Sequence, residues 1–199
     1  FQDPMTSLDP IQTIGKQISE VIIKHQCKTK AEAKEMAIDY MKKVGIPEAE
    51  RRYDEYPLQY SGGMRQRIVI AIALACKPDV LICDEPTTAL DVTVQAEILA
   101  LLRHIRDEYN TSVLLITHNM GVVADLADSV AVMYQGKIIE RAPATELFYD
   151  PHQPYTKALL ASVPHLGRQS ASGIMSEAER KMLLSGHIVV EAKGMEVTY

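Results

Sequence analysis

The chain has 199 residues, of which 47% are hydrophobic and 24% are charged, and its formal net charge is −5. This length suffices for one good hydrophobic core or two small ones. The acidic balance argues against a nucleic-acid surface, because such domains are usually basic, so we expect no nucleic-acid partner. No apolar run approaches the roughly 20 residues that span a bilayer, and the N-terminus has no signal-peptide pattern.

The first part of the chain, residues 1–60, is predicted to be mostly helical. Isoleucines recur at helical spacing over residues 11–26, which indicates an amphipathic helix. Thr29 and Glu32 form a capping-box pattern at the start of a second helix, which Gly45 is expected to end. The polar stretch that follows predicts one more short helix.

The sequence YSGGMRQR, residues 60–67, places a turn of small residues directly before a predicted helix over residues 64–76. A turn of this kind aims backbone N–H groups at a phosphate. A nucleotide site within one chain normally adds a lysine, in the pattern G-x-x-x-x-G-K-[ST]. That pattern occurs nowhere in the 199 residues, so we expect another domain to supply the lysine.

The middle of the chain alternates apolar runs with helical patterns. Residues 80–85 (VLICDE) and 112–117 (SVLLIT) are predicted to be buried parallel strands, and residues 130–134 a third strand. Asp91 is expected to cap the helix between the first two strands, and His118 directly follows the second strand. This order of strands and helices predicts an α/β fold with a parallel sheet.

The C-terminal part is predicted to begin with a hairpin turn at Gln135 and Gly136. Residues 143–163 are typical of two short helices, and residues 164–187, rich in Gly, Ser and charge, of a linker. Residues 188–199 alternate like the first strand of a following domain.

Two adjacent carboxylates, Asp84 and Glu85, stand at the end of the first predicted strand. Side chains alternate in direction along a strand, so one can hold a metal while the other faces a reacting water. The alternative is that both merely begin an exposed loop. His118 would open on the same sheet edge, although a lone histidine is more often structural. Asp91 is fully explained by helix capping, and Gln2 carries no signal by itself.

The chain has three cysteines, Cys27, Cys76 and Cys83, with no C-x-x-C spacing. An odd number without paired spacing is typical of reduced, intracellular thiols. Two of the three stand in apolar segments, so we expect buried cysteines.

Taken in order, these motifs resemble the ATP-binding domain of ABC transporters, over about residues 1–163. The dipeptide, oligopeptide and nickel importer branch is the most similar, through the segments FQDPMTSLDP, YSGGMRQR and DPHQPYTKALL. The matching motifs are the Q-loop (Phe1, Gln2), the signature motif (Ser61, Gly62, Gly63, Met64, Arg65), the Walker B strand (residues 81–85), the D-loop (Ala89, Leu90, Asp91) and the switch histidine (His118). Asp9, Leu58, Tyr60 and Asn119 depart from the pattern of the branch, and none of these changes removes a catalytic group.

The resemblance implies a set of residue roles. Glu85 would polarise the attacking water, Asp84 would bind Mg²⁺ through water, and His118 would contact the γ-phosphate. Gln2 would link the metal and the water to the transport gate. The cofactor-binding set would be Ser61, Gly62, Gly63 and Asp91, of which the signature residues would hold the ATP of a second ATP-binding domain. ATP and Mg²⁺ are therefore the expected cofactors, with positioning and electrostatics carrying the phosphoryl transfer.

The resemblance also implies a fold and partners. We expect a P-loop NTPase-like (ABC ATPase) α/β domain with an inserted helical subdomain, residues 1–60, and an ATPase core, residues 61–142. Residues 143–163 would be the extension typical of peptide importers. The Walker A part precedes the Q-loop in the family, so we expect an N-terminally truncated domain that is inactive alone. An iron–sulfur cluster needs four thiolates, and residues 143–199 contain no cysteine, so none is expected.

The implied function is that of the ATP-hydrolysing subunit of an importer for peptides or a related small solute. It would work peripherally at the cytoplasmic face of the membrane, with transmembrane permease subunits bound to residues 11–57. Two alternatives are a module without a P-loop that completes a partner's ATP site, and a DNA-repair or chromosome-maintenance ATPase. Losing the Walker A strand would expose strand edges, so we expect residues 187–192 to pair there, either within the chain or between chains as a strand-exchanged homo-oligomer.

Overall fold

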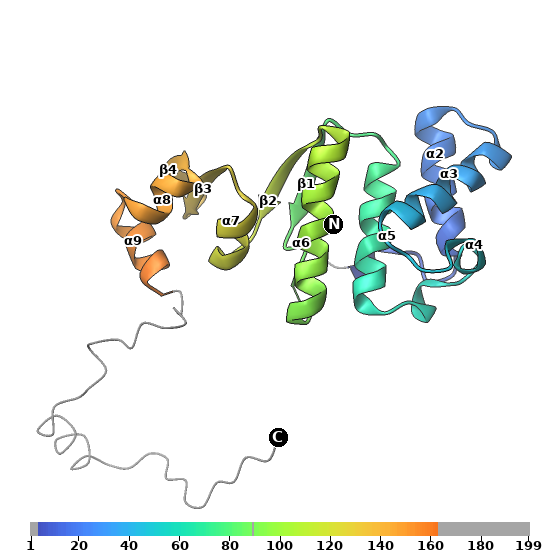
Figure 1. The fold of residues 1–199 in the computed structure, drawn as a ribbon, viewed down its shortest axis with the longest axis horizontal. Coiled ribbons are helices and arrows are strands. Elements are labelled where there is room, and N and C mark those ends of the chain that lie inside the picture. The colour runs from blue at the N-terminus through green and yellow to red at the C-terminus, as the bar shows by residue number, and fades with distance from the viewer. Residues whose placement is uncertain (1–3, 89, 163–199) are drawn as a thin grey trace, which may run out of the picture. The chain divides into compact units, whose positions relative to one another are not determined.

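The computed structural model describes residues 4–88 and 90–162, and its helical part comes first (Figure 1). The helices of this part are α1 (Pro4–Ser7), α2 (Ile14–Gln26), α3 (Lys30–Lys43) and α4 (Ala49–Arg52), with the 3-10 helix η1 (Pro57–Gln59). The capping box before α3 is confirmed, since the Thr29 side chain accepts from the Glu32 backbone and the Glu32 side chain binds the Thr29 backbone.

Helix α2 begins at Ile14 rather than at residue 11 as expected. The Asp9 side chain accepts a hydrogen bond from the backbone of Ile11, which holds this residue in the preceding turn, 83% exposed. The buried face of the helix starts at Ile14 and continues with Ile18 and Ile22, all fully buried. The isoleucine pattern therefore gave the correct helix and an N-terminus three residues too early.

Helix α5 (Gly62–Leu74) lies at the centre of the core. It contacts α1, α2 and α3 of the helical part and also α6 (Val92–Tyr109). Ile68, Ala71 and Leu74 are among its buried residues, which explains why the helix is apolar almost all round. One continuous core thus joins the helical part to the first strand.

The parallel sheet consists of β1 (Val80–Asp84) and β2 (Ser112–Ile116), paired in register from Val80 with Ser112 to Asp84 with Ile116. Helix α6 forms the crossover and contacts β2. The prediction that both faces are buried is wrong. Leu81 and Cys83 are buried on one face, whereas Ile82 is 59% and Leu114 52% exposed on the other. Within the described residues no element covers that second face.

The third strand, β3 (Ser129–Tyr134), does not join the parallel sheet. It pairs antiparallel with β4 (Lys137–Pro143) in a separate two-stranded sheet, because the described chain has no strand between β2 and β3. The predicted hairpin turn is confirmed, since Gln135 and Gly136 both have the positive φ of a type I′ turn. Within the described residues, β2 and β3 each keep one unpaired edge, as expected.

Three short helices complete the described chain: α7 (Met120–Leu126), α8 (Ala144–Tyr149) and α9 (Pro154–Ala161). Val132, Ala142 and Leu147 form a second, small core that joins the hairpin to α8. The Glu140 carboxylate accepts hydrogen bonds from the backbones of His152 and Gln153, which fixes the start of α9.

The described residues up to Leu160 form one compact unit. The predicted linker 164–187, the strand 188–199 and the strand donor 187–192 lie outside the described residues, so these stay predictions. No helix of the described part is long and apolar enough to cross a membrane.

Candidate catalytic edge and signature turn

The two carboxylates at the end of β1 are placed differently. Asp84 is the last residue of the strand, opposite Ile116 of β2. Glu85 extends the ladder by one bond, from its backbone N–H to the Ile116 carbonyl at 2.9 Å, and then turns the chain with a φ of 48°. Such left-handed backbone is uncommon for a residue other than glycine, and it occurs preferentially at functional sites.

Glu85 and His118 lie at the same edge of the sheet, as the sequence predicted, and their side chains meet across the ends of the two strands. His118 donates its backbone N–H to Glu85 Oε1 at 3.2 Å and places Nδ1 at 2.7 Å from the same oxygen. A carboxylate only accepts, so Nδ1 carries the proton. The Glu85 side chain is 17% exposed and that of His118 82%, which leaves Nε2 of the imidazole free to face a ligand.

Thr88, which sequence reasoning missed, donates its hydroxyl to the second oxygen of Glu85, at 3.0 Å. Partial burial, the largest single influence, raises the pKa of Glu85. The hydrogen bonds from His118 and Thr88 together outweigh it, so the pKa lies below its usual range. The carboxylate is therefore ionised and oriented at neutral pH. The sequence signal that could have identified Thr88 is a hydroxyl residue three positions after a glutamate at the end of a strand.

Asp84 differs, because its carboxylate forms no hydrogen bond or ion pair with any described residue. Mg²⁺ in nucleotide sites keeps several waters and is held by one or two carboxylates together with the phosphates. One free carboxylate at the strand end fits this donor set. Gln2, the other predicted metal contact, lies outside the described residues.

The signature turn begins α5. Ser61 is the N-cap of the helix, and its Oγ accepts from the Met64 backbone at 3.3 Å. A Cβ on Gly63 would clash with Val94 Cγ1 of α6, so this glycine lets the two helix starts approach closely. At Gly62 the nearest atom, Leu90 Cδ2, would be 4.0 Å away, which is ordinary contact.

Asp91 is the N-cap of α6, as predicted, and its Oδ1 accepts from the Val94 backbone at 2.9 Å. The contact between Gly63 and Val94 therefore places the start of α6 beside the signature turn. Arg67 ties the same two helices further along, through Glu97 Oε2 at 2.8 Å, and also donates to the Val44 carbonyl at 2.7 Å.

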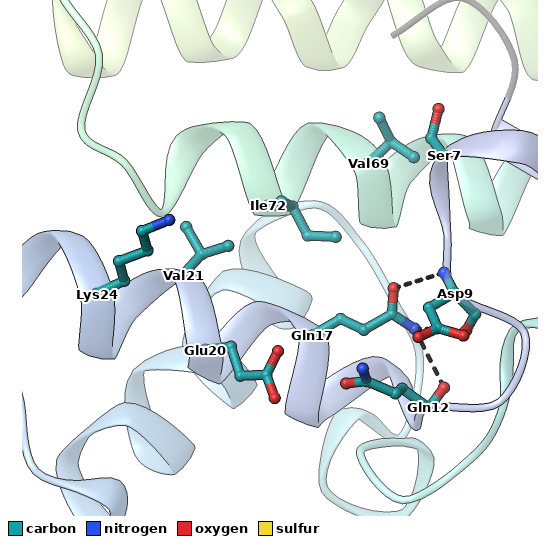
Figure 2. Close-up of a pocket in the computed structure, with 9 residues that line it drawn as sticks. All are labelled: Ser7, Asp9, Gln12, Gln17, Glu20, Val21, Lys24, Val69 and Ile72. Atoms are coloured by element: carbon teal, nitrogen blue, oxygen red, sulfur yellow. Dashed lines mark hydrogen bonds between the residues drawn. The ribbon is translucent and has the colours of Figure 1, made fainter.

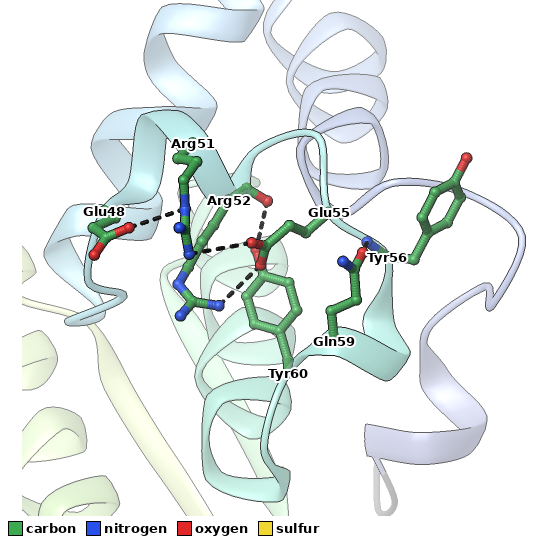
Figure 3. Close-up of polar contacts among 7 residues, drawn as sticks. All are labelled: Glu48, Arg51, Arg52, Glu55, Tyr56, Gln59 and Tyr60. Atoms are coloured by element: carbon green, nitrogen blue, oxygen red, sulfur yellow. Dashed lines mark hydrogen bonds and ion pairs between the residues drawn. The ribbon is translucent and has the colours of Figure 1, made fainter.

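A polar cluster supports the chain just before the signature turn (Figure 3). Tyr60 is buried and donates its hydroxyl to the Arg52 carbonyl at 2.6 Å, while the Arg52 guanidinium binds Glu55 at 2.9 Å. Burial raises the pKa of Tyr60 far above its usual value, so the phenol stays protonated. Tyr60 departs from the sequence pattern of the peptide-importer branch, yet its hydrogen bond to the Arg52 carbonyl gives it a defined anchoring contact.

Two hollows mark the surface of the helical part. The first is a cleft between α2 and α5, in which the Gln17 amide bridges the backbones of Asp9 and Gln12 (Figure 2). The second is an open groove beside η1, and its lining residues are Pro10, Arg51, Asp54, Glu55, Tyr56, Leu58 and Gln59. Neither hollow includes Glu85 or His118, so the catalytic edge is a separate surface.

The expectation that the cysteines are buried is wrong for Cys27 and Cys76, which are both exposed. Each follows the end of a helix, α2 and α5, where the apolar periodicity has already ended. Only Cys83, inside β1, is buried.

Comparison with known proteins follows the motifs. A family model described as "ABC transporter" matches residues 1–88, and one described as "Oligopeptide/dipeptide transporter, C-terminal region" matches residues 139–183. The oligopeptide transport ATP-binding protein AmiE of Streptococcus pneumoniae is 69% identical over 166 residues, which is 83% of this chain and 47% of AmiE. OppD of Bacillus subtilis, also an oligopeptide transport ATP-binding protein, is 55% identical over 83% of this chain and 46% of its own.

Solved structures show the same fold. The ATP-binding cassette MJ0796, in a dimeric post-hydrolysis state with ADP and Pi, matches with a TM-score of 0.62 and 27% identity over 72% of this chain and 61% of that chain. CbiO1 from Clostridium perfringens, part of an ABC transporter complex, matches with a TM-score of 0.66 and 29% identity over 75% of this chain and 58% of that chain.

These matches confirm the P-loop NTPase-like α/β fold class, and the chain spans about half the length of the curated relatives it matches. The motifs, the two family models and the relatives agree with one another. The chain therefore belongs to the ABC transporter family, among the ATP-binding proteins of its oligopeptide and dipeptide branch.

Proposed function

We propose that the whole protein of which this chain is part hydrolyses ATP to energise the import of peptides or a related small solute. The observation that carries this is the Glu85 carboxylate at the end of β1, ionised and held on both oxygens by His118 and Thr88. AmiE and OppD are both named as oligopeptide transport ATP-binding proteins. Their names favour this function over that of a DNA-repair or chromosome-maintenance ATPase.

Glu85 is the residue that polarises the attacking water. Its pKa lies below the usual range, so the carboxylate is charged at neutral pH and can accept a hydrogen bond from water. The proton of His118 Nδ1 is already directed at Glu85, so Nε2 is the nitrogen left for the γ-phosphate. Asp84 would hold Mg²⁺, and the metal would supply positive charge to neutralise the developing charge on the phosphates. Gln2 joins this metal and water to the transport gate.

The signature turn serves the ATP of a second ATP-binding domain. Ser61 and the N–H groups of Gly62 and Gly63 lie at the start of a 13-residue helix, where backbone donors and the helix dipole favour a phosphate. Asp91, which begins the neighbouring helix, is held beside this turn by the Gly63–Val94 contact. This arrangement explains how a chain without G-x-x-x-x-G-K-[ST] can contribute to an ATP site.

The permease is proposed to dock on the helical part, at the groove beside η1. Leu58 is 72% exposed there and stands next to the half-exposed Tyr56, while Arg51, Asp54 and Glu55 provide charge at the edge. An apolar centre with a charged rim is typical of a protein interface. The groove extends the predicted surface, residues 11–57, and would place the protein at the cytoplasmic face of the membrane. Crosslinks to the permease should map here and not to residues 92–142.

The test is Mg²⁺-dependent ATP hydrolysis by the full-length protein assembled with its transporter. Glu85→Gln keeps the size of the side chain and removes its charge, so turnover should fall at least about 100-fold. ATP binding, measured with a fluorescent analogue, should persist in the variant. The 199-residue chain alone should show no turnover. Full activity of Glu85→Gln, or turnover by the chain alone that this substitution abolishes, would contradict the proposal.

A further inference from the structure

Two exposed cysteines outside the proposed ATP site stand at the ends of neighbouring helices. Cys27 is the C-cap of α2, in left-handed backbone with a φ of 52°, and Cys76 follows the C-cap of α5. Both thiols are exposed, whereas Cys83 is buried. An exposed thiol is open to exchange with a disulfide in solution, while burial raises the pKa of the Cys83 thiol to about 11 and keeps it unreactive.

One hydrogen bond joins the residues immediately before the two thiols. The Gln26 side chain donates Nε2 to the Ala75 carbonyl at 2.8 Å, and α2 and α5 contact each other. Lys24 and Ile72, about one turn before each cysteine, line the same cleft (Figure 2). The helix ends that carry the two thiols are therefore adjacent although the cysteines are far apart in sequence.

We propose that Cys27 and Cys76 form a redox-sensitive thiol pair that a small disulfide oxidant closes into an intramolecular disulfide. One thiolate attacks a sulfur of oxidised glutathione, releases one reduced glutathione and forms a mixed disulfide. The second thiolate attacks the protein sulfur and releases the other reduced glutathione. The two thiol protons end on the two reduced glutathiones, and two electrons pass from the protein sulfurs to the oxidant. We do not propose that the two thiols bind a metal ion, because the described residues contain no group of three or more His, Cys, Asp or Glu side chains that could hold one.

The bond would have a direct mechanical effect. It would join the end of α2 to the end of α5, the helix whose other end is the signature turn at Ser61. The pair needs chain ends that can settle into disulfide geometry, with Cα atoms about 4.4–6.8 Å apart. Cys27 stands before the short link to α3 and Cys76 before the link to β1, so the proposal requires that these two links let the thiols approach to that distance.

The experiment treats the folded chain with oxidised glutathione at micromolar protein, blocks free thiols with iodoacetamide and digests the product with endoproteinase Asp-N. Cleavage before aspartates places the three cysteines on separate peptides, residues 9–38, 54–78 and 79–83. The expected product links peptides 9–38 and 54–78, about 2 Da lighter than their sum because two hydrogens are lost. Peptide 79–83 should carry iodoacetamide only after unfolding, which makes Cys83 the internal control.

Matched variants complete the test. Cys27→Ser should leave a glutathione adduct on Cys76 and no linked peptide, and Cys76→Ser the reverse. Cys83→Ala should form the link as the wild type does. Mixing light and ¹⁵N-labelled chains should give linked peptides of one isotope only. Glutathione on both cysteines without a link, a link between light and heavy chains, or no reaction at all would each overturn the proposal.

Discussion

The helical part and the parallel sheet share one core but differ in how far their apolar faces are covered. In the helical part every long helix has its apolar face covered, with Ile14, Ile18 and Ile22 fully buried. In the sheet, β1 and β2 are covered on one face, and large apolar side chains on the other face are about half exposed. The difference teaches that the described residues cover the apolar faces of the helices, whereas they leave one apolar face of the sheet that carries Glu85 exposed to a degree unusual for a protein surface.

The largest expected effect separates the two regions by a matched pair of truncations. Ile18→Ala empties a fully buried site and should lower the free energy of unfolding by about 2–5 kcal/mol. Ile82→Ala removes the same atoms from the uncovered face of β1 and should cost less than about 1 kcal/mol. Urea unfolding followed by circular dichroism measures both. Equal losses would break the comparison, because they would mean that the face of Ile82 is covered in solution.

The second test concerns the start of α5, where the helical part contacts α6, the helix that packs on the sheet. Gly63→Ala places a Cβ against Val94 Cγ1 and should destabilise the chain by about 1–3 kcal/mol through overpacking. Gly62→Ala, one residue earlier, has room and should be neutral or stabilise by up to about 1 kcal/mol through helix propensity. Adding Val94→Ala to Gly63→Ala should restore most of the loss. If the double variant is no more stable, the glycine is not there for packing.

A smaller effect sharpens the account of the helical part. Thr29→Ala removes the capping box of α3 and should lower the free energy of unfolding by about 0.5–2 kcal/mol. Thr13, the N-cap of α2, makes no side-chain hydrogen bond to its helix, so Thr13→Ala is the matched control and should change stability by a few tenths at most. The same unfolding measurement compares the two. A larger loss at Thr13 would contradict the capping argument.

The smallest effect belongs to the sheet edge and is a titration. The pKa of Glu85 is lowered in the folded chain, so its hydrogen bonds stabilise the fold above the unfolded pKa, and this stabilisation is lost as the pH falls through the folded pKa. NMR of ¹³C-labelled glutamate should show Glu85 titrating below ordinary glutamates. Thr88→Val should move that pKa upward, whereas Thr88→Ser, which keeps the hydroxyl, should not. An unchanged pKa in Thr88→Val would remove Thr88 from the site.

The sequence predicted local structure well wherever a local signal decides it. The Thr29 capping box, the Asp91 cap and the turn at Gln135 and Gly136 are all confirmed, because each depends on contacts a few residues apart. The sequence also predicted that Glu85 and His118 share one sheet edge, since parallel strands end at one edge, whereas the hydrogen bond between them was not predicted.

Longer-range features were predicted less well. The burial of Ile82 was wrong, because an apolar run shows what a strand can bury and not whether the chain provides the cover. The separate pairing of the third strand agrees with the expectation that its edge and that of the second strand stay open, because no described strand lies between them. Thr88 was missed because the loop geometry that turns its hydroxyl toward Glu85 has no periodic pattern.

The left-handed backbone of Glu85 sets stability against activity at a single position. A residue with a Cβ pays roughly 1 kcal/mol or more in this conformation, and glycine relieves that strain. Glu85→Gly would thus ease the turn while deleting the carboxylate on which the proposed hydrolysis depends. Laboratory evolution of this protein for heat resistance alone would be drawn toward that substitution, and would reward the loss of the chemistry unless transport were selected alongside.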